Sequence, residues 1–261
     1  MRSDHKARLL RRQEFSAGLF SAIFQAPLLA RQIAPGQFVM LEIPGRVRPY
    51  LRRAYSVADA EPSSGEVEFL VKTIGPGTAA LENLGEGSEA RLLGPLGNAF
   101  RTDDLSAGAR VAIVAGGIGA APFPLLLKAL AARSIAADFY LGGRSAREIA
   151  LASRFVGLTA GKTVLATDDG SAGEKGFVTD AFARRAVRGG YARAYACGPM
   201  PMFAALAPIV ARLGVPAEFS TEAAMGCGFG ACLGCVLPSV NNTYIVSCTA
   251  GPILAPEVVR W

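Results

Sequence analysis

Histidine is almost absent from this sequence, and charged side chains are fewer than usual. His5 is the only histidine in 261 residues, which excludes histidine-dependent catalytic triads, histidine-rich metal sites and histidine proton shuttles. Charged residues make up 18% of the chain and hydrophobic residues 51%, which excludes an intrinsically disordered or acidic-tail protein. A chain of this length predicts about two domains, with room for a small appendage.

The sequence also shows no signal peptide and no convincing membrane-spanning helix. Residues 1–14 are charged throughout and have no apolar core. Residues 111–127 are uncharged, but the glycines and prolines within them favour a strand, a turn and a helix start over one continuous transmembrane helix. We therefore expect a cytoplasmic protein with no membrane partner.

The basic residues are spread along the chain and do not form one stripe. The formal charge of +6 comes from 27 Lys and Arg against 21 Asp and Glu. The densest basic stretch contains Arg46, Arg48, Arg52 and Arg53, mixed with Pro49 and Tyr50. This stretch is more typical of an anion pocket than of a nucleic-acid surface. For every arginine except Arg53, a solvated face is the alternative.

Short runs broken by Gly and Pro predict an antiparallel barrel or sandwich for the first hundred residues. Residues 66–73 alternate in polarity, and the predicted inner face is apolar: Val67, Phe69 and Val71. The predicted outer face of that half-buried strand is charged: Glu66, Glu68 and Lys72. Further strands are expected at residues 18–25, 37–43, 53–58 and 88–93.

After residue 108 the pattern changes to alternating strands and helices, which predicts a parallel sheet covered on both faces. The expected strands are residues 111–115, 137–141, 163–166, 192–197 and 215–219. The expected helices are residues 123–132, 146–155, 178–187 and 200–213. From Thr221 onward the chain is rich in Gly and Cys, and this tail is too short to fold by hydrophobic burial alone.

Four of the five cysteines lie in that tail, with the spacing of a plant-type 2Fe-2S site. The candidate ligands are Cys227, Cys232, Cys235 and Cys248. The glycines between them allow a tight loop and leave backbone N–H groups able to approach sulfur. A structural zinc site is the first alternative, although it predicts two paired C-x2-C knuckles and only one is present. Disulfides are less expected without a secretion signal.

Two motifs fall where ligands bind in an open α/β sheet, at the carboxyl ends of strands. The first is a buried strand followed by a glycine turn, Gly116, Gly117 and Gly119, and a helix entered through Pro122. Backbone amides at such a helix start can hold phosphate, although a tight turn without a ligand is the alternative. The second motif contains Cys197, Gly198, Pro199 and Met200, in which Cys197 alone would suit an ordinary buried thiol.

A third motif lies in the predicted barrel, at Arg53, Ala54, Tyr55 and Ser56. A turn containing Gly77 and Thr78 follows the strand at residues 66–73 and opens a short helix over residues 78–84. Arginine and hydroxyl donors beside such a turn can hold a pyrophosphate, while Tyr55 lies against a flat ring. Each piece alone is commonplace.

Together and in this order, RAYS, GPGT, GGIGAAP, CGPMPM and the four-cysteine tail resemble the ferredoxin-reductase superfamily. They are most similar to the electron-transfer subunits of dihydroorotate dehydrogenase B, over nearly the whole chain from Ala7 to Val258. Oxygenase reductases carry a longer ferredoxin domain whose last cysteine lies much further on. Tyr55 departs from the dihydroorotate subset and matches general flavin reductases.

The resemblance implies an FAD-binding β-barrel at residues 1–103, an NAD-binding α/β domain at 104–214 and a 2Fe-2S tail at 215–261. It implies FAD at the barrel motif, at Leu70, Val71 and Lys72, and at the Gly77 turn. It implies NAD over the glycine turn and the Cys197 motif, with no catalytic acid or base of the chain's own.

The resemblance further implies an oxidoreductase subunit in a hetero-oligomer with a flavin-containing dihydroorotate dehydrogenase catalytic subunit. Electrons would pass from that subunit through 2Fe-2S and FAD to NAD, in pyrimidine biosynthesis. The alternative is an NAD(P)H-ferredoxin reductase-type subunit of a glutamate-synthase-like, sulfide dehydrogenase or hydrogenase complex.

Overall fold

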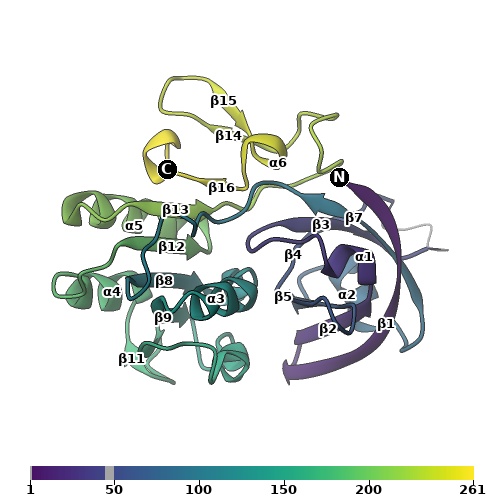
Figure 1. Cartoon of the computed structure of the whole chain (residues 1–261), viewed down its shortest axis with the longest axis horizontal. Coiled ribbons are helices and arrows are strands. Elements are labelled where there is room, and N and C mark those ends of the chain that lie inside the picture. Colours follow the sequence, from purple (N-terminus) through teal and green to yellow (C-terminus); the bar gives the residue numbers. More distant parts are fainter. Residues whose placement is uncertain (1, 45–49) are drawn as a thin grey trace.

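Two seven-stranded sheets form the bulk of the protein, which is described by a computed structural model for residues 2–44 and 50–261. The sheets lie side by side, and the C-terminal part of the chain crosses above both (Figure 1). We call the two bodies the barrel domain and the α/β domain, and residues 221–261 the cysteine tail. Within the described residues, no helix is long and apolar enough to cross a membrane.

The barrel domain is an antiparallel sheet in the order β4-β3-β7-β1-β2-β6-β5. Its strands are β1 (Ser3–Ser16), β2 (Leu19–Gln25), β3 (Phe38–Glu42), β4 (Arg53–Ser56), β5 (Asp59–Glu61), β6 (Glu66–Lys72) and β7 (Glu89–Leu96). Two short helices close it, α1 (Pro27–Ala30) and α2 (Pro76–Glu82). The longest strand, β1, lies before residue 18, where the sequence analysis expected barrel structure but no particular strand. It pairs with β2 and β7 and buries Ala7 and Leu9.

Strand β6 is buried on both faces, so the expectation of a half-buried strand is wrong. Glu68 and Leu70, on the face expected to meet solvent, are 8% and 4% exposed. The α/β domain covers that face, where the Arg154 guanidinium donates to both carboxylate oxygens of Glu68 at 2.7–3.2 Å. A polar strand face therefore forms part of a domain interface.

The α/β domain is a sheet in the order β11-β10-β9-β8-β12-β13-β16, parallel except for β16. Its strands are β8 (Arg110–Gly116), β9 (Ala136–Gly143), β10 (Thr163–Thr167), β11 (Glu174–Lys175), β12 (Arg193–Cys197), β13 (Ala217–Ser220) and β16 (Ile253–Leu254). Its helices are α3 (Phe123–Ala132), α4 (Val178–Ala186) and α5 (Met200–Leu213), with 3-10 turns η1 (Gly117–Ala120) and η2 (Ala150–Phe155). The helix expected over residues 146–155 is only the 3-10 turn η2.

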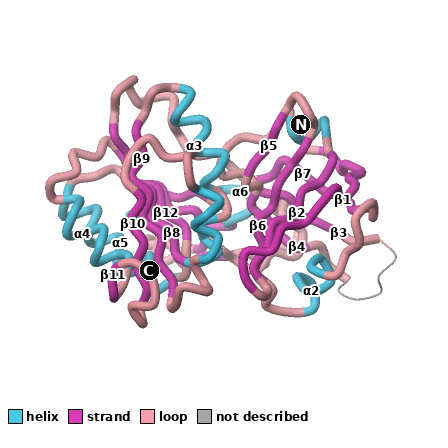
Figure 2. Tube along the Cα trace, turned by 90° about the horizontal axis from the view of Figure 1, so that it is seen from below, coloured by secondary structure: helices cyan, strands magenta, loops and turns pink. Residues whose placement is uncertain are grey.

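Alternating residues of β8 feed two apolar clusters, one on each face of the sheet. Val111 and Ile113 pack in the cluster that contains α3, whereas Ala112 and Val114 pack with α4 and α5. The first cluster also includes Leu70 of the barrel domain, and α3 lies between the two sheets (Figure 2). The two domains therefore share one hydrophobic core.

The cysteine tail contains little regular structure and is anchored at both ends. It comprises β14 (Val236–Pro238), β15 (Tyr244–Val246), α6 (Ser247–Ala250), the edge strand β16 and the 3-10 turn η3 (Pro256–Val258). At its end, the Trp261 ring lies 5.0 Å from that of Phe203 and 5.5 Å from that of Phe219, and its indole N–H donates to the Pro256 carbonyl. The boundary expected at residue 215 remains a prediction, although β13 pairs with β12 in the sheet.

Candidate functional site

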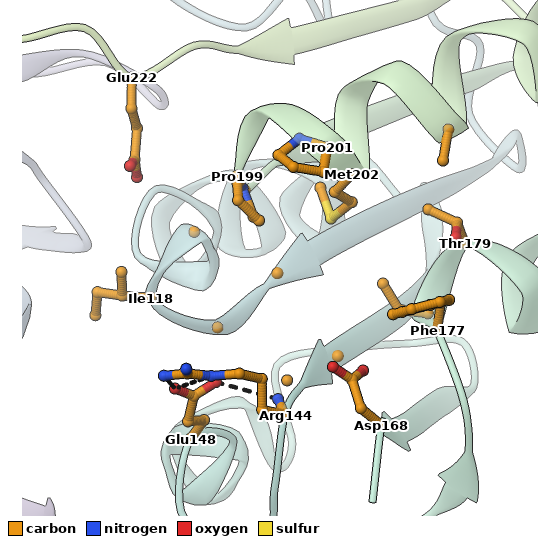
Figure 3. A pocket seen from close by; sticks show the side chains of 18 of the residues that line it. Ile118, Arg144, Glu148, Asp168, Phe177, Thr179, Pro199, Pro201, Met202 and Glu222 are labelled. Carbon is orange, nitrogen blue, oxygen red and sulfur yellow. Dashed lines mark hydrogen bonds and ion pairs between the residues drawn. The ribbon is translucent and has the colours of Figure 1, made fainter.

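A cavity of about 620 Å³ lies at the carboxyl ends of β8, β9, β10 and β12 (Figure 3). The glycine turn and the Cys197 motif, which are far apart in sequence, form one side of it. Its lining residues are Lys72, Gly116, Gly117, Ile118, Gly119, Gly142, Gly143, Arg144, Glu148, Asp168, Phe177, Val178, Thr179, Gly198, Pro199, Pro201, Met202, Ala205 and Glu222. A cavity at this edge of a parallel sheet is where such folds bind nucleotides.

Close packing explains why the turn needs glycine. A Cβ on Gly119 would lie 2.4 Å from the Cys197 carbonyl oxygen, and one on Gly116 would lie 2.8 Å from Pro199 Cδ. Gly117 adopts a left-handed backbone with a φ of +54° and has open space around it. The turn therefore brings backbone amides to the cavity without side chains in the way, as a phosphate cradle requires.

Three residues of the expected dinucleotide site lie off this cavity: Cys197, which lines a second cavity, Pro122 and Met200. Pro122 caps the start of α3, and Met200 begins α5 without lining the space. Pro201 and Met202 line it instead, because the first turn of α5 presents them to the cavity. The polar groups Arg144, Glu148 and Asp168 were not foreseen. Arg144 and Asp168 each follow a predicted strand, which was the available signal, whereas Glu148 falls in the expected helix over residues 146–155.

A second cavity, of about 260 Å³, lies between the barrel domain, the α/β domain and the start of the cysteine tail. It contains seven of the residues expected to hold flavin: Ala54, Tyr55, Ser56, Leu70, Val71, Lys72 and Thr78. The other lining residues are Phe38, Ile74, Ile118, Ala121, Cys197, Ser220, Thr221, Glu222, Ala223, Met225 and Pro252. Arg53 and Gly77 line a small adjoining space with Tyr55.

The barrel motif is organised by burial and by turn hydrogen bonds. Tyr55 packs edge-on to Phe69 at 6.1 Å, and burial raises the pKa of its phenol to about 12, against a smaller opposing effect of Arg53. The phenol therefore stays protonated at neutral pH. The Thr78 hydroxyl accepts from the backbone N–H groups of Ile74 (2.9 Å) and Gly75 (3.2 Å), which shapes the turn. Arg53 lies against Gly77, where a Cβ would come within 3.1 Å of its Nε.

The rest of the basic stretch does not gather into an anion pocket among the described residues. Arg46, Arg48 and Pro49 lie outside the described residues. The Arg52 guanidinium pairs with Asp4 at 2.9 Å and with Glu42 at 2.7 Å. Its charge is therefore already neutralised by carboxylates.

The four tail cysteines are arranged as two pairs. The Cys232 backbone N–H donates to Cys227 Sγ (3.4 Å), and the Cys248 N–H donates to Cys235 Sγ (3.4 Å). The Gly230 N–H donates to Cys248 Sγ at 3.2 Å, which brings the loop between the first two cysteines onto the second pair. In residues 2–44 and 50–261, no three His, Cys, Asp or Glu side chains converge as a single-ion site.

Two pairs of thiolates fit a two-iron cluster better than one zinc ion, because each iron takes two sulfurs. The pairs differ in environment: Cys232 is exposed, whereas Cys235 and Cys248 are buried. Burial opposes ionisation of Cys227, but N–H donors from Phe229, Cys232 and Ala231 lower the pKa of its thiol to about 6. Burial first, and then Cys235, raise the pKa of Cys248. The soft donors and N–H···S bonds suit an iron-sulfur cluster.

The cysteine loop and the two cavities are contiguous. Cys235 and Cys248 belong to an apolar cluster with Phe38 of β3, and Phe38 lines the second cavity. The two cavities in turn share three lining residues, Lys72, Ile118 and Glu222. The three expected sites are therefore adjacent, in the order cysteine loop, second cavity, first cavity.

Three family models match successive parts of the chain. They are the oxidoreductase FAD-binding domain at residues 6–100, the oxidoreductase NAD-binding domain at 113–207 and the iron-sulfur cluster binding domain of dihydroorotate dehydrogenase B at 222–259. These matches confirm the expected fold class and the three expected cofactors.

Among solved structures, that of NADH-dependent reduced ferredoxin-NADP oxidoreductase superposes with a TM-score of 0.86 at 27% identity, covering 97% of this chain and 89% of the other. The ferredoxin reductase of carbazole 1,9a-dioxygenase shares the fold, with a TM-score of 0.71, 24% identity and coverage of 84% and 69%.

Two curated relatives extend the likeness over the chain. Both are named dihydroorotate dehydrogenase B (NAD(+)), electron transfer subunit. The protein from Desulforamulus reducens is 36% identical over 91% of this chain and 91% of its own. The protein from Geobacillus sp. is 34% identical over 99% of this chain and 100% of its own. The chain therefore belongs to the family of dihydroorotate dehydrogenase B electron transfer subunits.

Proposed function

We propose that this chain carries electrons from a dihydroorotate dehydrogenase catalytic subunit to NAD, in pyrimidine biosynthesis. The observation that carries the proposal is the contiguity of the cysteine pairs, the barrel cavity and the α/β cavity through Phe38, Lys72 and Glu222. In the overall reaction dihydroorotate loses two electrons and two protons, NAD+ takes up two electrons and one proton as a hydride, and one proton is released.

We assign each cofactor to residues of the chain. The 2Fe-2S cluster takes Cys227, Cys232, Cys235 and Cys248; FAD takes residues 53–56 and 70–72, Gly77 and Thr78; NAD takes the cavity of the glycine turn. When bound, FAD exchanges electrons singly or in pairs and the cluster exchanges them singly, which links a hydride carrier to a one-electron carrier. The chain's residues bind these groups and keep them in sequence.

The adenosine end of the dinucleotide belongs at Asp168 and Phe177. These residues lie across the cavity from Glu222, which is on the wall shared with the flavin cavity (Figure 3). The Asp168 carboxylate suits ribose hydroxyls and repels a 2′-phosphate, which favours NAD over NADP. An Asp168→Ser variant is expected to use NADPH better relative to NADH than the parent protein does.

We propose that the catalytic subunit docks over the exposed thiol pair. The same part of the tail carries exposed apolar side chains: Phe229, Leu233, Val236 and Tyr244 are 37–74% exposed. Cys232 is exposed among them. Exposed apolar side chains beside a functional site are typical of a protein interface, and here they would bring the partner against the electron-transfer site.

Co-expression with a candidate catalytic subunit tests this proposal. Size-exclusion chromatography should show a complex that reduces NAD+ when dihydroorotate is supplied. A Leu233→Asp variant should lose the complex, whereas Val187→Asp should keep it, since Val187 is 72% exposed at the end of α4. Cys232→Ser should abolish dihydroorotate-dependent NAD+ reduction but retain NADH oxidation by an artificial dye.

The second candidate is a reductase subunit of another oxidoreductase complex. It is motivated by the likeness to NADH-dependent reduced ferredoxin-NADP oxidoreductase, at a lower identity than that of the curated relatives. If protein with intact FAD and cluster forms no complex with the dihydroorotate dehydrogenase subunit, the first proposal is wrong and this one replaces it.

A further inference from the structure

The two cavities meet at a wall that carries two ionisable side chains of opposite charge. Lys72 comes from β6 of the barrel domain, and Glu222 follows β13 at the start of the cysteine tail. Figure 3 shows the Glu222 side chain reaching toward the cavity from the segment above α5. Any ring that contacts both a flavin in one cavity and a dinucleotide site in the other must lie beside this wall.

The two charges on the wall are compensated unequally. Lys72 Nζ donates to Glu148 Oε1 at 2.8 Å, so a carboxylate of the α/β domain neutralises it. Glu148 also pairs with Arg144, whose side chain is 78% exposed and therefore well screened by water. Glu222 makes no comparable ion pair within residues 2–44 and 50–261. It is an exposed residue that lines both cavities, and the atoms around its carboxyl partly remove it from water.

The position of the nicotinamide ring follows from the chemistry of hydride transfer. The reacting atoms must approach to about 3–3.5 Å, so the ring must lie against the flavin at the shared wall. The ring of NAD+ carries a positive charge, whereas that of NADH is neutral. A carboxylate beside the ring therefore stabilises one redox form and leaves the other almost unaffected.

We infer that Glu222 discriminates between the redox forms of the bound dinucleotide and holds NAD+ in preference to NADH. This inference rests on the proposed function. The paired Lys72 does not cancel the effect, because Glu148 already offsets its charge. The consequence for turnover is directional: NAD+ is retained until it is reduced, and the neutral NADH is released.

Binding measurements on the oxidised FAD-containing protein test the inference without any turnover. The probes are NAD+ and 1,4,5,6-tetrahydro-NAD, a redox-inactive analogue with an uncharged ring. Glu222→Gln keeps the side-chain shape and removes the charge. We expect this variant to weaken the binding of NAD+ about tenfold and the binding of the analogue less than about twofold. Glu222→Asp should restore part of the preference.

A matched control separates ring charge from general damage to the cavity. Asp168 is a second carboxylate of the same cavity, at the end away from the flavin. Asp168→Asn should weaken NAD+ and the analogue by the same factor, because both carry the same adenosine. The ratio of the two dissociation constants is therefore the readout, since a structural defect would not move it.

The pH dependence of that ratio gives a second readout. Burial raises the pKa of the Glu222 carboxyl, so its charge is lost at a higher pH than for an ordinary glutamate. The ionisable groups that line the two cavities with it are Tyr55, Lys72, Arg144, Glu148, Cys197 and, at the far end of the first cavity, Asp168. The preference for NAD+ should fall as the pH is lowered and should be flat in Glu222→Gln.

Three results would overturn the inference. Equal weakening of both probes in Glu222→Gln would make Glu222 a structural residue. An unchanged ratio with a shifted flavin reduction potential would place its influence on the flavin. If the ratio of the two dissociation constants in the parent protein does not change with pH, the charge of Glu222 is not the cause of the preference for NAD+. In contrast, a protein that binds neither FAD nor NAD+ would contradict the proposed function itself.

Discussion

The glycine turn at residues 116–119 and the cysteine loop at 227–235 are both short and glycine-rich, but their surroundings differ. The glycine turn is enclosed by two large apolar clusters that cover both faces of the α/β sheet. The cysteine loop rests on a small cluster in which Cys235 and Cys248 are themselves buried members. Hydrophobic burial shapes the nucleotide cavity before any ligand arrives, whereas the loop depends on what its thiolates bind.

The largest expected effect comes from removing one thiolate. Cys227→Ser should remove the cluster and loosen the chain after Thr221, because a small metal-stapled segment loses its fold with the metal. FAD and NADH-to-dye activity should stay largely intact. Iron content, the visible spectrum and limited proteolysis measure the three outcomes.

Cys197→Ala is the control for that experiment, since Cys197 is the thiol outside the tail and should leave the iron content unchanged. If FAD were lost first while iron remained, the tail would not be the independent unit that the comparison describes.

Breaking the contact between the barrel and α/β domains should have the next largest effect. Arg154 is 22% exposed and bridges Asp59 and Glu68, which are each 10% exposed as side chains. Lys128 still pairs with Asp59 at 2.6 Å, so Arg154→Ala leaves the Glu68 carboxylate without its partner. We expect a loss of about 3 kcal/mol in the free energy of unfolding, because a buried charge is left uncompensated.

Urea unfolding of Arg154→Ala measures that cost. Arg11→Ala is the matched control, since Arg11 makes a similar two-bond pair with Glu66 at an exposed site. It should cost less than about 1 kcal/mol. Equal losses of unfolding free energy in the two variants would mean that the ion pairs at the domain interface stabilise the protein no more than a surface pair does.

Filling the glycine turn tests the preformed nucleotide site. Gly119→Ala should destabilise the protein by about 1–3 kcal/mol and weaken NAD+ binding, because its methyl group meets the backbone at residues 197–198. In Gly117→Ala the added methyl group contacts no other atom. The loss in the free energy of unfolding should come only from the left-handed backbone and be about 1 kcal/mol. Equal NAD+ affinities in the two variants would contradict the role of close packing.

The smallest expected effect is a pH-dependent one at the shared wall. Arg144 chiefly, against burial and with help from Lys72, lowers the pKa of Glu148 from 4.5 to about 2. Its stabilising contribution is therefore present above pH 4.5 and is lost as the pH falls toward 2. The difference in urea midpoint between the parent protein and Glu148→Gln should shrink over that range. A difference that stays constant over that range would contradict this role of Glu148.

The elements that sequence predicts best are those held by local signals. The bounds predicted for α5 match the structure, because Met202, Phe203, Leu206 and Val210 follow a helical period and Gly214 caps the end in a left-handed conformation. The expected helix over 146–155 is a 3-10 turn instead, and its Arg154 pairs with carboxylates of the barrel domain, contacts that no local signal predicts.

Long-range pairing explains what sequence could not predict. Strand β1 alternates clearly only around Ala7 and Leu9, and its other residues are defined by the partners β2 and β7. The cysteine site, by contrast, could be predicted from sequence, because the spacing of its four thiols alone matches an iron-sulfur motif. Glu222 is a lone glutamate after a strand, and only the meeting of two domains and the tail places it between two cavities.

Trp261 gives the protein an optical reporter at a chosen place. It is the only tryptophan in the chain, and its ring packs at a tilt against Phe203 and Phe219 at the far end of the cysteine tail. Its tryptophan emission therefore comes from one site, which is outside the lining of both nucleotide cavities. Detachment of the tail would expose the indole to water and shift its emission to the red, so the docking of the last residues can be followed separately from unfolding of the domains.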